Sequence, residues 1–159
     1  MTTTAVWLSR AVLYRDRDVM DERIELRSST RGAQPCSEDA ARVGAIRRIA
    51  AARLRYCGLD ALRDDVMLVV SELVTNAVLH AGTSEVRVSM TVRDGFLVVT
   101  VVDGVPGAAA TRHTDGNSES GRGLELVEAV ARVHGGSWGT SNAGAETWCR
   151  LAVPPQIQP

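Results

Sequence analysis

The segment from about Ala61 to Ala81 constrains the fold most, because it reads as a long helix that is apolar nearly all round. Asp60 precedes this helix, and Gly82 is expected to end it in the left-handed conformation. A helix without a broad polar face is buried on most of its sides. The rest of the chain must therefore supply the elements that cover it.

Three polar side chains interrupt this helix at a spacing of four residues: Glu72, Asn76 and His80. The spacing stacks them in one stripe along the helix. Because a buried carboxylate or amide without a partner costs several kcal/mol, the stripe must face water, a partner or a ligand. Spacing alone leaves both a solvated edge and a ligand site open.

The elements before and after this helix alternate between the two types. Ser37 is expected to cap an earlier helix that stops near Gly58. After the central helix, strict alternation predicts a strand over 86–92, and Asp94-Gly95 predicts a tight hairpin into a second strand over 96–102.

A third helix and two closing strands complete the pattern. The helix is expected over Leu124–Val133, where apolar residues follow the helical period, and it should end at Gly135-Gly136. The strands are expected around 137–140 and 146–153, joined by a turn at 142–144.

These elements predict an α/β (α+β) two-layer sandwich, in which a mixed, largely antiparallel sheet carries its helices on one face. We expect one domain over residues 35–154, followed by a tail over 155–159. Residues 1–34 are expected to form a flexible N-terminal extension, with a possible early strand around 24–27 and no part in nucleotide binding.

Composition excludes several classes of function. All 18 basic residues are Arg, so the Lys of a P-loop or of an ordinary protein kinase is absent. The 19 acidic residues balance the arginines, which argues against direct nucleic-acid or membrane partners. Three cysteines without close pairing, and no signal-peptide or membrane-spanning run, favour a reducing cytoplasm.

Two glycine-containing motifs follow the hairpin. Asp103-Gly104-Val105-Pro106-Gly107 stands where a buried strand enters a loop of lid-like length, and it can present a carboxylate to an exocyclic amine or form a plain turn. Ser120-Gly121-Arg122-Gly123-Leu124 is expected to open the third helix as an anion-binding turn, with Arg122 adding a positive charge. Each motif is weak alone, and the ordered set is more specific.

In that order, the motifs resemble those of a known family. The segment 71–82 resembles the N-box of the bacterial anti-sigma-factor serine kinases, within the histidine-kinase-like (GHKL) ATPase superfamily. Residues 103–107 resemble the first glycine box of that superfamily and residues 121–127 the second. The resemblance implies the Bergerat ATP-binding fold, with ATP and Mg²⁺ as cofactors.

The resemblance also implies roles for particular residues. It makes Asn76 the Mg²⁺ ligand and Glu72 the general base, and it places Asp103 on the adenine amino group with Gly107 letting the ring approach. A lid over 108–120 would close above the phosphates. The other expected cofactor-binding residues are His80, Gly121, Arg122, Gly123, Leu124 and Thr147. A packing role at the helix end is the alternative for His80.

Two positions depart from the family pattern. Val105 stands where the first box often has glycine; we expect it either to strain the loop and weaken ATP binding or to follow a relaxed path, and we favour strain. The last strand can be aligned in two registers, which bring either Glu146 or Thr147 near adenine, and we favour Thr147.

The resemblance implies a serine kinase that phosphorylates a protein antagonist and also binds a sigma factor, with a homodimer possible. One alternative is a nucleotide-regulated binding module without phosphotransfer. Another is the detached catalytic domain of a sensor kinase, which is disfavoured because His80, His113 and His134 all lie at or after the N-box.

Overall fold

The computed structural model describes residues 16–27, 36–80, 82–107 and 119–155, and for His80 and residues 119–121 only the backbone is described. Within these ranges the strands are β1 (Arg17–Glu25), β2 (Glu85–Arg93), β3 (Phe96–Val102), β4 (Ser137–Ser141) and β5 (Glu146–Ala152). The helices are α2 (Ser37–Tyr56), α3 (Arg63–His80) and α5 (Glu119–Val133), with 3₁₀ turns η1 (Asp60–Leu62) and η2 (Asn142–Gly144).

The strands form one sheet in the order β1-β2-β3-β5-β4, and every pairing in it is antiparallel. The two-layer α+β sandwich is confirmed, whereas the parallel component of the expected mixed sheet is not found among the described strands. Asp94 and Gly95 both have positive φ, at 51° and 79°, as a two-residue hairpin turn requires. The hairpin prediction is therefore confirmed.

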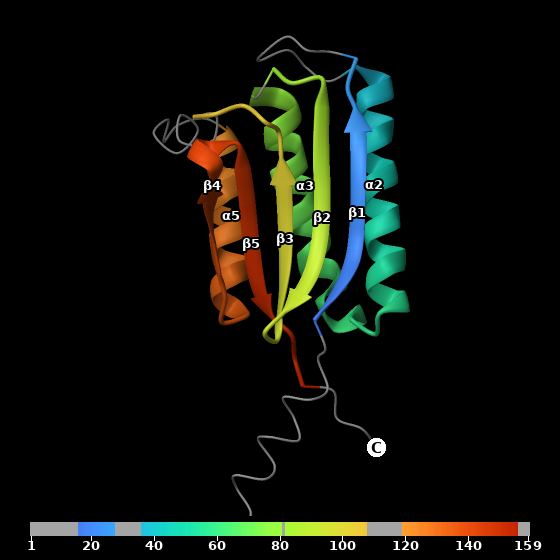
Figure 1. Ribbon diagram of the computed structural model, residues 1–159, viewed down its shortest axis with the longest axis vertical. Helices are drawn as coiled ribbons and strands as arrows, with labels where there is room; N and C mark the ends of the chain where they lie inside the picture. The colour runs from blue at the N-terminus through green and yellow to red at the C-terminus, as the bar shows by residue number, and fades with distance from the viewer. Residues whose placement is uncertain (1–15, 28–35, 81, 108–118, 156–159) are drawn as a thin grey trace, which may run out of the picture.

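All three helices cover the same face of the sheet (Figure 1). α3 lies over β2 and β3, and it is flanked by α2, which contacts β1, and by α5, which contacts β4 and β5. Inward-pointing side chains of β1, β2, β3 and β5 form the core with α3. Among them is Cys149, whose burial raises the pKa of its thiol to about 12 and so keeps it protonated.

The structure corrects the boundary expected at residue 35. β1 pairs with β2 from Arg17 opposite Val92 to Glu25 opposite Glu85, so residues 17–25 belong to the sheet. Four apolar side chains of this segment are buried in the core: Val19, Met20, Ile24 and Leu26. An irregularity between Asp18 and Met20 breaks the alternation, which hides the strand from a search for a period of two.

Two helix starts also differ from expectation. Cys36, and not Ser37, is the N-cap of α2, and no side chain caps the helix. Instead, the buried Asp39 of the first turn accepts a hydrogen bond of 3.0 Å from the N–H of Arg27, which ties the end of β1 to α2. α5 begins at Glu119, five residues before the expected Leu124.

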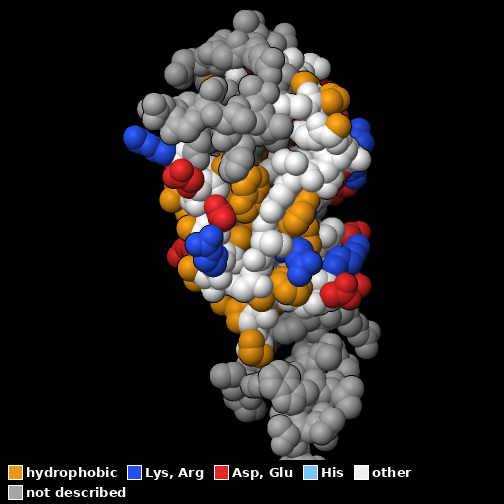
Figure 2. All heavy atoms as spheres, turned by 90° about the vertical axis from the view of Figure 1, so that its left-hand side faces the viewer, with side chains coloured by type: hydrophobic (Ala, Val, Ile, Leu, Met, Phe, Trp, Pro, Cys, Tyr) orange, Lys and Arg blue, Asp and Glu red, His pale blue; other side chains and the backbone are white. Residues whose placement is uncertain are grey.

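The outer face of the sheet carries charged pairs where the inner face carries the core. Arg87 donates two hydrogen bonds, of 2.8 and 2.6 Å, to the carboxylate of Asp21 on the neighbouring strand. At the β4 and α5 side of the molecule, charges of both signs alternate with hydrophobic patches (Figure 2). In the described part of the chain, no helix combines the length and the apolar character needed to cross a bilayer.

Truncation of Ile24 tests whether β1 supports the core. Ile24→Ala should lower the free energy of unfolding by about 2–5 kcal/mol, since the side chain is 3 % exposed and its loss leaves a cavity. The neighbouring Arg23 is exposed, and Arg23→Ala should change stability by less than about 0.5 kcal/mol. Urea denaturation measures both, and equal effects would place β1 outside the core.

Candidate functional site

The polar stripe of α3 faces α5. Glu72 and Asn76 lie one turn apart, and α5 crosses them at Gly123, where an added Cβ would collide with Oε2 of Glu72 and lie 3.6 Å from Nδ2 of Asn76. Only a glycine lets the two helices approach this closely with the Glu72 carboxylate in place. The structure therefore brings together Glu72, Asn76 and Gly123, as the motifs predicted.

Asn76 is buried without satisfying its hydrogen-bonding groups. Its side chain is 4 % exposed, and its Nδ2 has no hydrogen-bond partner in the part of the chain that the structure describes. A buried amide without a partner costs about 1–3 kcal/mol, so native proteins retain few of them without a reason. This burial rules out the solvated edge as an explanation for Asn76.

Glu72 is also without a hydrogen bond or ion pair to the described residues, although it is only half-buried. A carboxylate and an amide on adjacent turns are thus both available to a ligand at the α3–α5 seam. Carboxylate and amide oxygens are the protein groups that hard cations such as Mg²⁺ prefer.

Asp103 follows β3 on the helix-covered face of the sheet. The side chains of Val99 and Val101 point to the same face, and Asp103 continues their alternation and is 7 % exposed. Its Oδ1 accepts a hydrogen bond of 2.8 Å from the N–H of Val105, which holds the carboxylate in an Asx-type turn.

The loop 103–107 is fastened to the turn that precedes β5. The N–H groups of Asp103 and Gly104 both donate to the carbonyl of Ala145, at 3.1 and 3.3 Å. Further along, the N–H of Gly107 donates to the carbonyl of Ala143 at 2.6 Å. Residues 142–144 were expected only as a turn, because no side-chain pattern indicates a hydrogen bond between two backbone segments.

Two glycines make this contact possible. Gly107 has φ +79°, and Gly144 has φ +91° with its Cα so near Gly107 that an added Cβ would lie 3.0 Å from the Gly107 nitrogen. Ala143 has a positive φ as well, at 55°. The turn is thus built around backbone conformations that few residues adopt.

Val105 does not strain the loop, contrary to the favoured expectation. It is not among the described residues with positive φ, and Gly104, at φ +72°, takes the left-handed position instead. The relaxed path was the other alternative, and it is the one observed. The strain argument for weak ATP binding therefore no longer holds.

Thr147 lies on the same face of the sheet as Asp103. It pairs with Val101 in the sheet register and is buried, whereas Glu146 points to the other face and accepts a hydrogen bond from Asn142. Of the two registers considered, the structure thus places Thr147 on the side that carries the other site residues.

The second glycine motif is inside α5 and not before it. Gly121, Arg122 and Gly123 are helical residues, so the unpaired N–H groups of the helix start belong to the turn around 119–121. Leu124 is 3 % exposed and packs in the core, whereas Arg122 is exposed. Residues 121–123 thus do not form the anion-binding turn that was expected to open the helix, and Gly123 instead faces Glu72.

Two expected parts of the site lie outside what is described. Residues 108–118, which make up most of the expected lid, are not described, and neither is the side chain of His80 at the end of α3. In the described ranges no three His, Cys, Asp or Glu residues cluster closely enough to hold a metal by themselves. A cation bound through Asn76 would take most of its ligands from water and from phosphate oxygens.

Comparison with known proteins agrees with this geometry. The family model of the histidine kinase-like ATPase domain matches residues 36–151, from the N-cap of α2 to the last residue but one of β5. A search of curated proteins found no match. The matched region includes α3, α5, the loop 103–107 and the turn that holds it, and it spans most of the chain. The protein therefore belongs to the histidine kinase-like ATPase family.

Proposed function

We propose that this protein is a serine kinase that binds Mg-ATP at the α3–α5 seam and transfers the γ-phosphoryl group to a partner protein. Histidine kinase-like ATPase domains bind ATP, normally with Mg²⁺. The observation that carries the proposal is the buried, unpartnered amide of Asn76 beside the unpartnered carboxylate of Glu72.

Asn76 suits the role of metal ligand. A half-turn of its amide exchanges nitrogen and oxygen, so the position now held by the unpaired Nδ2 can present the oxygen to a cation. When bound there, Mg²⁺ would neutralise negative charge on the β- and γ-phosphates. Gly123 faces Glu72, and the exposed Arg122 directly precedes Gly123 in α5.

Asp103 suits recognition of the base. The N–H of Val105 fixes its carboxylate, and the bonds to Ala145 fix its backbone, so the acceptor oxygens are held in position before a ligand arrives. A carboxylate held in this way accepts a hydrogen bond from an exocyclic amine such as that of adenine. Thr147 lies on the same face and offers a hydroxyl.

Glu72 suits the role of general base. It accepts the proton of the substrate serine hydroxyl while the serine oxygen bonds to the γ-phosphorus, and the P–O bond to ADP breaks. ADP carries away the electron pair of that bond. The resemblance to anti-sigma-factor kinases supports an anti-sigma antagonist as the phosphorylated protein, a sigma factor as a second partner, and a homodimer as the working form.

Removal of the Asn76 amide should abolish the Mg²⁺-dependent part of ATP binding. Calorimetric titrations of Asn76→Ala with and without Mg²⁺ should give similar affinities, whereas the unchanged protein should bind more tightly with the metal. Thr75→Ala is the matched control, because Thr75 is the exposed neighbour on the same helix. Equal metal dependence in all three proteins would contradict the assignment.

Replacement of Glu72 should separate binding from transfer. Glu72→Ala should keep its ATP affinity and lose phosphotransfer by about 10²-fold or more, the usual scale for a positioned base. The assay follows radiolabel from ATP onto candidate antagonist proteins. ATP binding without transfer by the unchanged protein would favour the binding module, and an acid-labile label would favour a histidine kinase.

A methyl group at Gly123 should act through Glu72. Gly123→Ala should leave stability unchanged or raise it by up to about 1 kcal/mol, because alanine favours helices and the flexible Glu72 side chain can move aside. The rate of phosphotransfer should fall nearly as far as in Glu72→Ala, and the double variant should transfer no more slowly than Glu72→Ala alone. Glu125→Ala, exposed on the same helix, is the control. Additive losses would show that Gly123 and Glu72 act independently.

A further inference from the structure

Unpaired positive charge is concentrated on one surface of this nearly neutral protein. Four arginines of α2 are exposed and are here called the arginine face: Arg47, Arg48, Arg53 and Arg55. Arg48 and Arg55, seven residues apart, lie on the side turned away from the core, and Arg47 and Arg53 lie toward its two edges. None of the four guanidinium groups has a hydrogen bond, ion pair or ring contact within the described part of the chain. No acidic residue occurs between Asp39 and Asp60, so the helix itself offers no partner.

Most other described arginines are occupied. In the sheet, for example, Arg87 pairs with Asp21, and Arg150 stacks on Phe96, whose ring centre lies 4.0 Å from the guanidinium. On the side formed by β4 and α5 the charges are mixed in sign (Figure 2). Between residues 40 and 59, by contrast, α2 carries positive charge only.

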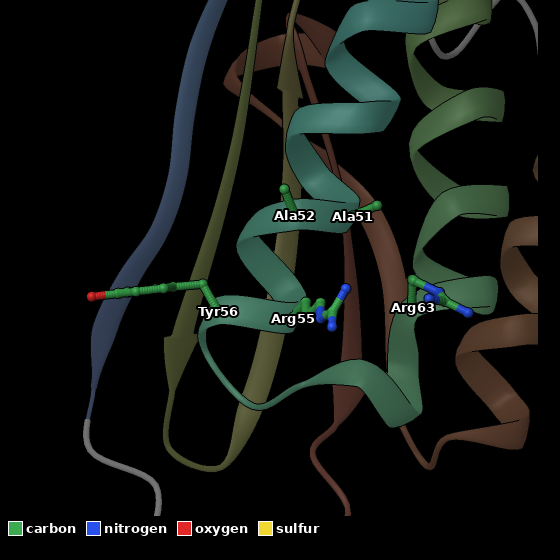
Figure 3. A pocket seen from close by; sticks show the side chains of 5 residues that line it. All are labelled: Ala51, Ala52, Arg55, Tyr56 and Arg63. Atoms are coloured by element: carbon green, nitrogen blue, oxygen red, sulfur yellow. The ribbon is translucent and has the colours of Figure 1, made fainter.

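A groove is open beside this face. It has a volume of about 550 Å³ and lies where the end of α2 meets the start of α3, with Ala51, Ala52, Arg55, Tyr56 and Arg63 around it. Figure 3 shows the short side chains of the two alanines on α2, with Arg55 reaching toward α3 and Tyr56 projecting to the opposite side. The small alanine side chains leave room for side chains of another molecule.

Tyr56 is exposed to an unusual degree for a large side chain, at 86 %. Tyrosine and arginine are the residues enriched at the energetic centres of protein interfaces, where they bury large area at low entropic cost. Guanidinium groups bind carboxylates through paired hydrogen bonds. An exposed tyrosine among unpaired arginines is thus suited to a partner with acidic side chains.

We propose that the arginine face, with Tyr56 and the adjoining groove, is a docking surface for an acidic segment of a partner protein. Charge complementarity identifies the class of partner, and the field of the unpaired guanidiniums would speed its encounter. The net charge of the whole chain is −1, unlike the strongly basic domains that bind nucleic acid. The apolar side of α2 is already buried in the core, so it is not available to enter a bilayer.

The docking surface is separate from the candidate ATP site. Arg63 begins α3 and Asn76 lies thirteen residues later, which is roughly 20 Å along the helix. A partner can therefore dock while the α3–α5 seam is occupied. The inference does not depend on phosphotransfer, and the two proposals can fail separately.

The test measures binding of a fluorescein-labelled peptide in which Glu alternates with Leu, by fluorescence anisotropy with the full chain. Affinity should fall as salt rises, and Arg48→Gln/Arg55→Gln should weaken it about fivefold or more. Tyr56→Ala should weaken it about tenfold. The control Arg23→Gln/Arg150→Gln removes two exposed charges from the outer face of the sheet and should leave the affinity unchanged.

Several results would overturn the proposal. These are no measurable binding, equal weakening by the control pair, or equal affinity for a peptide with Gln in place of Glu. Tighter binding of single-stranded oligonucleotide or of phosphatidylserine vesicles to the same arginines would assign the surface to a different class of partner. Calorimetry with Mg-ATP should give the same affinity for the docking variants and the unchanged protein, whatever the peptide result.

Discussion

The burial of α3 is the constraint on which the rest of the structure depends. This helix is covered by β2 and β3 beneath it and by α2 and α5 beside it, so Asn76 is buried and Glu72 is half-buried. Glu72 and Asn76 fall at the seam with α5, where Gly123 leaves just enough space for them. Packing alone therefore produces two polar groups without partners in an otherwise apolar layer. At the other end of the α3–α5 pair, His134 lies 2.5 Å from the carboxylate of Asp65 and joins the end of α5 to the start of α3.

The site is assembled by two different kinds of interaction. On the seam, side chains decide the geometry, because the close approach of α5 depends on which atoms Glu72 and Gly123 present. Around Asp103, backbone hydrogen bonds decide it, because the loop 103–107 is tied to the carbonyls of Ala143 and Ala145. β5 connects the two regions. It begins directly after the turn that holds the loop 103–107, places Thr147 on the helix-covered face, and pairs with both β3 and β4. A displacement of β5 would consequently change the geometry of both the α3–α5 seam and the loop 103–107.

The sequence predicted those features that depend on periodicity or on local turn chemistry. The hairpin at Asp94-Gly95, the long central helix and the alternation of the inner strands each follow from a short window of residues. The failures have a common physical origin in interactions between distant segments. Only the end of β1 was expected, around 24–27, because the bulge and the charged outer face obscure the rest of this edge strand. The start of α5 was expected too late because its first residues include two glycines, which intrinsic helix propensity disfavours. The bond from Gly107 to Ala143 joins residues whose side chains carry no signal at all.

The backbone hydrogen bonds that hold the loop 103–107 affect how the sequences of such proteins can diverge. The donors and acceptors of these hydrogen bonds are main-chain atoms: every residue supplies a carbonyl, and every residue except proline supplies an N–H. Mutation can therefore replace most side chains in the turn without breaking a hydrogen bond. Only the left-handed positions, such as Gly107 and Gly144, limit the substitutions that can be accepted. Proteins that share these hydrogen bonds can thus lose recognisable sequence similarity in the turn while retaining its shape. Their common ancestry would then be traceable through the spacing of two glycines and the strand that follows them.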